Sequence, residues 1–186
     1  MKDPLHHDPL DALGAAYEKM FERAAEHFHK AEEKTGPLLH KLVDEARDKA
    51  VELRELSRED AEKVASWIKR DLSEAASYLS ETGRDLRDWL GFETTLVESG
   101  LFDFLLKAAD KTTISLLEMK EAAEQASTYH TGEITGPGTL VCDNCSEKLH
   151  FHRTGRIPPC PKCHGTTFHR YTSTYPKVTD SSMGSE

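Results

Sequence analysis

The four cysteines of the chain fall in two CxxC pairs, Cys142 with Cys145 and Cys160 with Cys163, and fourteen residues separate the pairs. In each pair, two thiolates can lie on one side of a tight turn whose backbone N–H groups hydrogen-bond the sulfurs. Two such knuckles facing each other provide four soft ligands in a tetrahedron, the geometry of a structural zinc site with four cysteine ligands. We therefore predict one structural Zn2+ per chain, held by Cys142, Cys145, Cys160 and Cys163.

Other uses of these thiols are open. Two disulfides would suit an oxidising compartment, but the first ten residues are polar and lack the apolar segment of an export signal. Four unrelated thiols are a second alternative, although no cysteine lies outside the two pairs. A thioredoxin-like redox CxxC needs a βαβ context, whereas short strands and turns are expected around both pairs. His164 directly follows Cys163 and could replace one thiolate, but four cysteines already fill a tetrahedral shell.

The ligand set also bears on catalysis. A catalytic zinc normally has three protein ligands and one open position, whereas four thiolates lower the Lewis acidity of the metal and leave no position for water. The sequence contains no GxSxG, P-loop, GxGxxG or HExxH motif and no paired-carboxylate arrangement. We therefore name no catalytic residue and expect a protein that is not an enzyme. A thiol redox or zinc-dependent enzyme is the least favoured alternative.

The elements that must position the cysteines begin with amphipathic helices. Apolar residues in the first part of the chain recur three and four apart, and charged residues fill the opposite face. We expect a first helix that ends at Gly36, where glycine can supply a left-handed C-cap. Residues 37–80 are expected to form one bent helix or two, with Ser57 as the N-cap of the second.

Two further segments complete the helical part. Between residues 82 and 100 the periodicity weakens, which predicts a short helix and a turn. Residues 101–126 are apolar on two sides, which is typical of a central helix in a bundle. The fold class is thus mainly α: residues 1–128 form an acidic antiparallel helical bundle or long helical hairpin, followed by a small β zinc ribbon. Heptad-like spacing also leaves a coiled coil open, so we expect a monomer or a dimer.

After residue 128 the pattern changes to that of β-strands and turns. Three short segments are predicted to be strands: 139–141, 148–153 and 166–172. Short strands around two knuckles define a four-cysteine zinc ribbon over residues 129–173. A domain of that size cannot bury enough apolar surface alone, so the metal must take the place of a core. Residues 174–186 are small and polar, and we expect a disordered tail.

The charge of the chain is unevenly distributed. Residues 1–128 contain 18 Lys and Arg against 28 Asp and Glu, a net charge of −10, whereas residues 129–186 contain 6 against 5, a net charge of +1. An acidic helical part repels nucleic acid and anionic membranes. Seven side chains are expected on a mildly basic outer face of the ribbon: His150, His152, His169, Lys148, Arg153, Arg156 and Arg170. Phe151 or Tyr171 could stack on bases there, but phosphate binding usually requires a denser cluster of cations.

Three segments together resemble a known family: residues 129–133 (Y-H-T-G-E), residues 136–145 and residues 160–163. The chain is similar to a family of uncharacterised bacterial zinc-ribbon-containing proteins, best represented in gammaproteobacteria, in which an acidic helical region precedes a ribbon with a Y-H-x-G-E motif. The resemblance implies the same architecture and the four ribbon cysteines as metal ligands. It implies no reaction, because the family has no established activity. The usual glycine after the last cysteine is displaced here, since His164 comes first and Gly165 second.

These observations predict a cytoplasmic, non-enzymatic zinc-binding protein that acts as an adaptor for an unknown protein partner. The alternative is a nucleic-acid-binding zinc-ribbon protein, in which the ribbon contacts the nucleic acid. No run of about eighteen apolar residues is present, so we expect no membrane-spanning segment.

Overall fold

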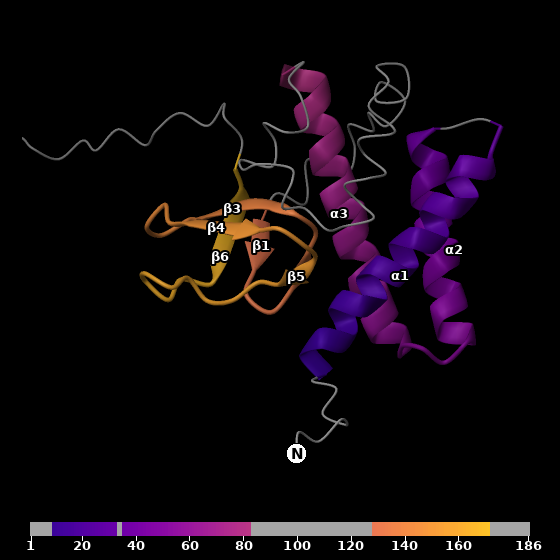
Figure 1. Cartoon of the computed structure of the whole chain (residues 1–186), viewed down its shortest axis with the longest axis horizontal. Helices are drawn as coiled ribbons and strands as arrows, with labels where there is room; N and C mark the ends of the chain where they lie inside the picture. The colour runs from indigo at the N-terminus through magenta and orange to yellow at the C-terminus, as the bar shows by residue number, and fades with distance from the viewer. Residues whose placement is uncertain (1–8, 33–34, 83–127, 172–186) are drawn as a thin grey trace, which may run out of the picture.

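The computed structural model of the chain describes residues 9–32, 35–82 and 128–171. Within these residues three helices precede six short strands (Figure 1). The helices are α1 (Pro9–Lys30), α2 (Gly36–Glu52) and α3 (Arg58–Thr82). The strands are β1 (Thr128–His130), β2 (Ile134–Thr135), β3 (Gly138–Cys142), β4 (Lys148–Phe151), β5 (Gly155–Arg156) and β6 (Thr167–Arg170). A helical N-terminal part followed by a β C-terminal part agrees with the prediction.

Some predicted elements lie outside the described residues. These are the short helix and turn between residues 82 and 100, the helix predicted over residues 101–126, and the tail at residues 174–186. All three stay predictions from sequence.

The connection between α1 and α2 differs from the prediction. Helix α1 ends at Lys30, and Gly36 is the first residue of α2 rather than the C-cap of α1. Thr35 is the N-cap of α2, and its side chain accepts a hydrogen bond from the Leu38 N–H at 3.3 Å. A threonine cap followed by Pro37 in the first helical turn is a strong helix start, because the cap satisfies a free N–H and proline has none to satisfy. The prediction of a C-cap at Gly36 was therefore wrong.

A short non-helical segment separates α2 from α3, so residues 37–80 form two helices rather than one bent helix. Helix α2 ends at Glu52 and α3 begins at Arg58. The Ser57 hydroxyl accepts a hydrogen bond from the Asp60 N–H at 3.1 Å and donates one to Asp60 Oδ2 at 2.8 Å. This arrangement resembles a capping box and confirms the predicted N-cap.

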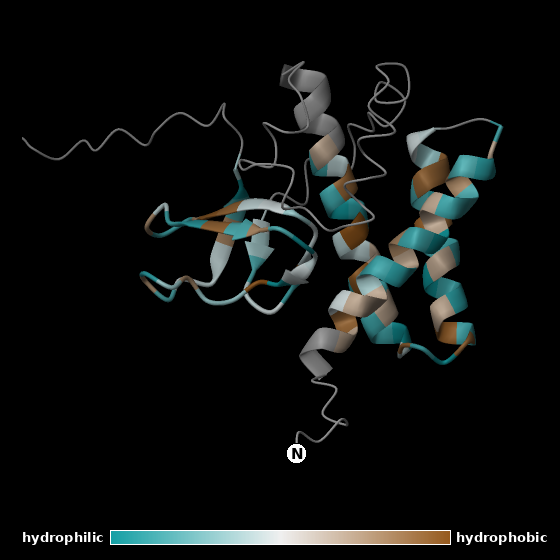
Figure 2. Cartoon of the chain, viewed as in Figure 1, coloured by the Kyte–Doolittle hydropathy of each residue, from teal (hydrophilic) through white to brown (hydrophobic). Residues whose placement is uncertain are grey.

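The three helices share one hydrophobic core, and the hydrophobic positions repeat along each helix in Figure 2. Its fully or almost fully buried side chains include Tyr17, Met20, Phe21, Phe28, Leu39, Val43, Val64 and Ile68. Ile134 of β2 belongs to the same core. Among the described helices, none combines the length and the hydropathy needed to cross a lipid bilayer.

The strands form two antiparallel sheets. The larger has the order β1-β6-β3-β4, and β2 pairs with β5 in the smaller. Strands β3, β4 and β6 correspond to the three predicted strands, whereas β1, β2 and β5 were not predicted. In the ladder of β3 with β6, Cys142 lies opposite Phe168. The first knuckle therefore begins at the end of a central strand.

The β region lies beside α1 and α3, and α2 lies on the far side of the helices (Figure 1). Strand β2 packs against α1 and α3, and β5 packs against α1. Thr154, just before β5, donates a hydrogen bond to Glu18 of α1. The sheets are thus held against two of the three helices, and this contact matters for the site.

Candidate metal centre

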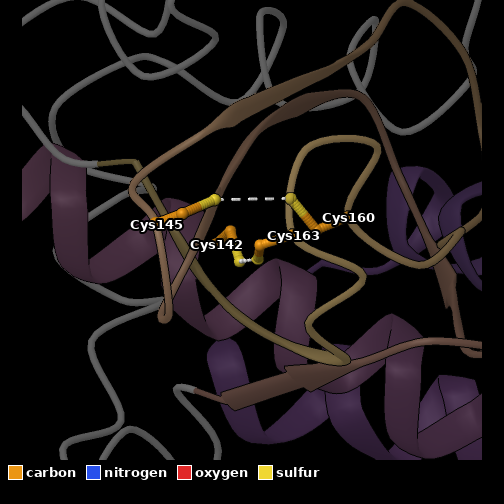
Figure 3. Close-up of side chains that lie close together, drawn as sticks. All are labelled: Cys142, Cys145, Cys160 and Cys163. Atoms are coloured by element: carbon orange, nitrogen blue, oxygen red, sulfur yellow. Dashed lines mark hydrogen bonds between the residues drawn. The ribbon is translucent and has the colours of Figure 1, made fainter.

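The four cysteine side chains point toward one another from two turns (Figure 3). All four sulfurs lie within 4.8 Å of one another, and no other group of metal-ligating side chains is found in the described part of the chain. The closest pairs join the two knuckles: Cys142 Sγ lies 3.6 Å from Cys163 Sγ, and Cys145 Sγ lies 3.5 Å from Cys160 Sγ. The structure thus brings together every cysteine that the sequence predicts as a ligand.

The spacing of the sulfurs fits a zinc ion. Zinc–thiolate bonds of about 2.3 Å in a tetrahedron place neighbouring sulfurs about 3.8 Å apart, close to the 3.5 and 3.6 Å found here. A disulfide would require about 2.05 Å, and all four cysteines are free thiols. The donor set and its geometry therefore suit a tetrahedral soft metal, and Cys142, Cys145, Cys160 and Cys163 are the residues that would hold it.

The two knuckles have the same backbone hydrogen bonds, although they share only the CxxC pattern in sequence. The residue after each second cysteine donates its N–H to the carbonyl of the first cysteine at 2.9 Å, and the first cysteine donates its own N–H to the carbonyl five residues later at 2.9 Å. The four bonds are Ser146 to Cys142, His164 to Cys160, Cys142 to Glu147 and Cys160 to Gly165. The turns themselves therefore position the sulfurs.

The residue after each knuckle has a left-handed backbone. Ser146 has φ 58° and His164 has φ 59°, a conformation that favours glycine. The exposed side chain of His164 is not part of the sulfur cluster. A Cβ on Gly165 would lie 3.1 Å from Cys142 Sγ and 3.2 Å from Cys163 Sγ, so a side chain there would crowd two of the four sulfurs.

The thiols of the site differ in acidity. Burial raises the pKa of Cys160, but the N–H groups of Cys163 and Lys162 and the neighbouring thiols outweigh it and lower the pKa to about 7. Burial raises the pKa of Cys142 above its usual value. One thiolate is therefore available near neutral pH, and a bound divalent metal would deprotonate the others.

A second polar cluster lies where the ribbon meets the helices, and Asp71 of α3 is its centre. Asp71 is completely buried. Its Oδ2 accepts hydrogen bonds from the Gly136 N–H at 2.7 Å and from the Tyr17 hydroxyl at 2.8 Å. Its Oδ1 lies 3.3 Å from Arg170 Nη2 and 3.4 Å from Arg70 Nε. We call the following residues the interface network: Tyr17, Arg70, Asp71, Glu74, Tyr129, Glu133, Thr135 and Arg170.

Tyr129 and Arg170 carry the ribbon side of the interface network. The Tyr129 hydroxyl lies 2.6 Å from Glu74 Oε2 and accepts a hydrogen bond from Arg170 Nη2 at 3.1 Å. Arg170 Nη2 also donates to Thr135 Oγ1 at 3.0 Å. Gly138 leaves room for this arginine, because a Cβ there would collide with Arg170 Nη1. The central strand β6 is thereby connected to α3.

Arg70 of α3 completes the contact. Its Nη1 donates to Glu133 Oε2 at 2.5 Å, and its Nη2 donates to the Ile134 carbonyl at 3.2 Å. The guanidinium lies 3.8 Å from the centre of the Tyr129 ring, and that of Arg170 lies 4.9 Å from the same centre. Two residues of the Y-H-T-G-E motif, Tyr129 and Glu133, thus bind α3 directly.

Burial and charge together shift the acidity of these groups. Burial raises the pKa of Tyr129 and of Tyr17 well above the usual value, so both hydroxyls stay protonated. Burial also raises the pKa of Glu74. Burial disfavours the Arg170 cation, but Tyr129, Asp71 and Glu74 together raise its pKa, so it stays charged.

The structure changes the predicted basic face of the ribbon. Arg170 is only 4% exposed and faces α3 rather than solvent. Arg156 is half-buried and donates to the Gly132 carbonyl at 2.8 Å. Lys148 and Arg153 are exposed as predicted. The expectation that Arg170 lies on the outer face was wrong: Arg170 is on the same face of β6 as the buried Phe168. Its partners on that face, Asp71 and Glu74, belong to α3.

Sequence analysis did not identify the helix side of the interface network. Asp71 lies four residues before Ala75, three after Ile68 and seven after Val64, which places it on the apolar stripe of α3. A carboxylate at such a position signals a buried partner. The partners themselves could not be found this way, because they come from a part of the chain far away in sequence.

The chain belongs to the family described as zinc-ribbon containing domain, whose model matches residues 26–172. The uncharacterized protein YbeL of Escherichia coli strain K12 is 29% identical over 129 residues, which cover 69% of this chain and 79% of YbeL. The YbeL proteins of Escherichia coli O6:H1 and O157:H7 show the same identity and coverage. No solved structure shows significant similarity to the chain. The resemblance to an uncharacterised bacterial zinc-ribbon family is confirmed.

Proposed function

We propose that this zinc-binding protein is a non-enzymatic adaptor that acts through a protein partner. One structural Zn2+ per chain is held by Cys142, Cys145, Cys160 and Cys163. The convergence of four thiols on one point carries this proposal. All-thiolate coordination leaves the metal without an open position for water, so the metal shapes a binding module rather than activating a substrate.

The proposal of a protein partner rather than a nucleic acid rests on the contacts that the cationic and aromatic side chains of the ribbon make within the protein. Arg170 is directed at Asp71 and Glu74, not at solvent. Tyr171 lies under Lys148, whose Nζ is 4.1 Å from the ring centre. Phe151 packs against the ribbon core. Two aromatic side chains that could stack on bases thus have partners within the ribbon, and the exposed cations are few, which argues against a phosphate-binding surface.

The helical part supplies the second argument. Residues 1–128 carry a net charge of −10, which repels nucleic acid and attracts a protein surface rich in Lys and Arg. We propose that these residues form an antiparallel helical bundle, and that the protein works in the cytoplasm as a monomer or a dimer.

Metal analysis tests the first part of the proposal. We expect one zinc per chain in reduced protein, measured by elemental analysis against protein concentration. No bound metal, or two zinc ions per chain, would contradict a single four-cysteine site.

Oligonucleotide binding tests the second part. Fluorescence anisotropy with single- and double-stranded oligonucleotides should show no binding near physiological ionic strength, about 0.15 M. The informative variant carries Lys148→Glu and Arg153→Glu, both on the exposed ribbon face. Its matched control carries Lys41→Glu and Lys63→Glu on the helices, with the same change in charge.

The alternative function, a nucleic-acid-binding ribbon, gives a different result. Binding of about micromolar affinity would then survive physiological salt and weaken in the ribbon variant but not in the helix control. Attraction seen only at low salt would be non-specific and would leave the adaptor proposal in place.

A further inference from the structure

Strand β6 connects the cysteine site to the interface network. Phe168 lies opposite Cys142 in the ladder with β3 and is completely buried in the ribbon core, which also contains Cys142 and Cys160. Arg170 is two residues further along, on the same face of the strand, and it binds Asp71 of α3. A change in the position of β6 at the cysteines would therefore move the arginine that contacts the helix.

Strand β1 makes a second connection. Tyr129 lies opposite Phe168 in the ladder with β6, and its ring belongs to the same ribbon core as the cysteines. Its hydroxyl reaches out of that core to Glu74 and Asp71 of α3, at 2.6 and 3.0 Å. The Tyr129 side chain thus packs in the core that contains the cysteines and also contacts α3.

The second knuckle is connected through a loop. Ile157, three residues before Cys160, donates its N–H to the Glu133 carbonyl at 2.9 Å and accepts from the Gly132 N–H at 2.8 Å. The Glu133 side chain binds Arg70 of α3, and the next residue, Ile134, is buried in the helical core. Each knuckle is therefore connected to α3 through a few residues: the first through β6, and the second through Ile157 and Glu133.

We propose that metal binding at the four cysteines and docking of the ribbon on α3 are thermodynamically coupled. The inference rests on the zinc site of the proposed function. A ribbon of this size keeps its strands in place only while the metal is bound. Loss of the metal releases Tyr129, Glu133 and Arg170 from α3 and exposes the polar face formed by Arg70, Asp71 and Glu74. The metal thus controls access to a surface on the helices.

Coupling of two sites is reciprocal, so weakening the docking must lower the affinity for zinc. The helix-side change Asp71→Asn alters no atom of the ribbon, and any effect on the metal must pass through the interface. We expect its zinc affinity, measured by competition with a chromogenic chelator, to fall about tenfold, within the range of roughly 5- to 150-fold typical of coupled sites.

The matched control is Asp44→Asn. Asp44 of α2 also accepts from two cations, Arg47 at 3.0 Å and Lys69 at 2.7 Å, but both are on helices. Zinc affinity of this variant should equal that of the unmodified protein. If Asp71→Asn does not fold, Glu74→Gln provides a milder helix-side change, because Glu74 binds only ribbon residues among the contacts described, Tyr129 and Arg170.

Metal removal tests the coupling from the other side. Hydrogen exchange of the full chain is compared with and without a chelator, under reducing conditions. We expect faster exchange in the ribbon and also in the part of α3 that contains Asp71, while the part of α2 around Val43 changes less.

The outcomes are distinguishable. Absence of zinc from the unmodified protein overturns the proposed function and this inference with it. One zinc per chain, with equal affinity in Asp71→Asn, Glu74→Gln and the control and with unchanged exchange in α3, overturns the coupling alone. A lower affinity in the helix-side variants together with faster exchange in α3 supports it.

Discussion

The four-cysteine site and the interface network are two polar clusters that are built in opposite ways. The cysteines come from two short turns, and the closest sulfur pairs join residues 21 and 15 positions apart. The interface network joins four segments that are distant in sequence: Tyr17 is 54 positions from Asp71, and Arg170 is 99 positions from it. The first cluster is local in sequence, and the second exists only after the helices and the ribbon have packed together.

The difference also concerns what satisfies the buried charge. The thiolates of the first cluster require a cation from outside the chain. The interface network contains its own cations, Arg70 and Arg170, and hydroxyls that donate to the carboxylates. The network as a whole should contribute little to the free energy of unfolding, because buried ion pairs recover little beyond their desolvation cost. Removal of one partner should nevertheless be strongly destabilising, because it leaves the other charge buried and unpaired. The following changes test whether the two clusters behave as this comparison requires.

The largest effect is expected at the metal site. Cys160→Ser removes one of four ligands, and structural zinc contributes about 10–16 kcal/mol in zinc-finger peptides. We expect loss of the metal and of ordered amide signals from the ribbon, measured by elemental analysis and NMR. His164→Ala is the control, because the histidine next to Cys163 lies outside the sulfur cluster. Retention of the metal by the serine variant would show that the site is not a four-thiolate site.

A smaller loss of stability is expected when the interface network is changed. Asp71→Ala leaves Arg170 and Arg70 buried beside an empty position, which should lower the free energy of unfolding by about 3–5 kcal/mol. Glu55→Ala removes a carboxylate that binds Lys19 and Arg23 near the surface, and should cost at most about 1 kcal/mol. Denaturant unfolding of both variants measures the difference. Equal losses would mean that the network adds nothing beyond surface pairing.

Alkaline pH should lower the free energy of unfolding through the two buried tyrosines of the interface network. Burial raises the pKa of Tyr129 and Tyr17, so the folded protein keeps protons that the unfolded chain releases above pH about 10. Stability is therefore full below that pH and falls above it, by about 1.4 kcal/mol per pH unit for each tyrosine. Tyr129→Phe and Tyr17→Phe should each reduce this slope in unfolding experiments across the alkaline range. An unchanged slope would place the ionisation elsewhere.

The smallest effect is expected behind the second knuckle. His164→Gly relieves a left-handed conformation that costs roughly 1–2 kcal/mol, partly offset by the greater freedom of glycine in the unfolded chain. A net gain of about 0.5–1 kcal/mol should appear in thermal unfolding. Ser146→Gly, with nearly the same φ, should behave alike. Gly165→Ala should instead destabilise, because its Cβ would lie 3.1 Å from Cys142 Sγ.

Much of the local structure could be predicted from the sequence. The CxxC spacing predicted the four sulfurs that meet, and Ser57 followed by Asp60 predicted the start of α3. The alternation around Leu149 and Phe168 predicted strands β4 and β6. Each knuckle, the Ser57 cap and each of these strands depends on residues within a few positions of one another, so a short stretch of sequence is enough to predict it. The meeting of the two knuckles joins residues 15 and 21 positions apart and was inferred from the ligand number of a tetrahedral site.

Other features needed the fold. Gly36 was assigned to the wrong helix because a Thr-Gly-Pro sequence can end one helix or begin the next, and the structure shows the Thr35 side chain capping α2. Strands β2 and β5 have two residues each and become strands only by pairing with each other. Two residues are too few to show an alternating pattern, so such strands cannot be predicted from the sequence alone.

By itself, the sequence identified the four cysteines that come together, the division into a helical and a β part, and the distribution of charge. The tertiary structure alone decided where Arg170 and Tyr129 lie and what the Y-H-T-G-E motif contacts. The physical reason is the range of the interactions. A zinc knuckle is fixed by backbone turns within a few residues, whereas a buried carboxylate such as Asp71 accepts its partners from whichever segments the hydrophobic core brings beside it.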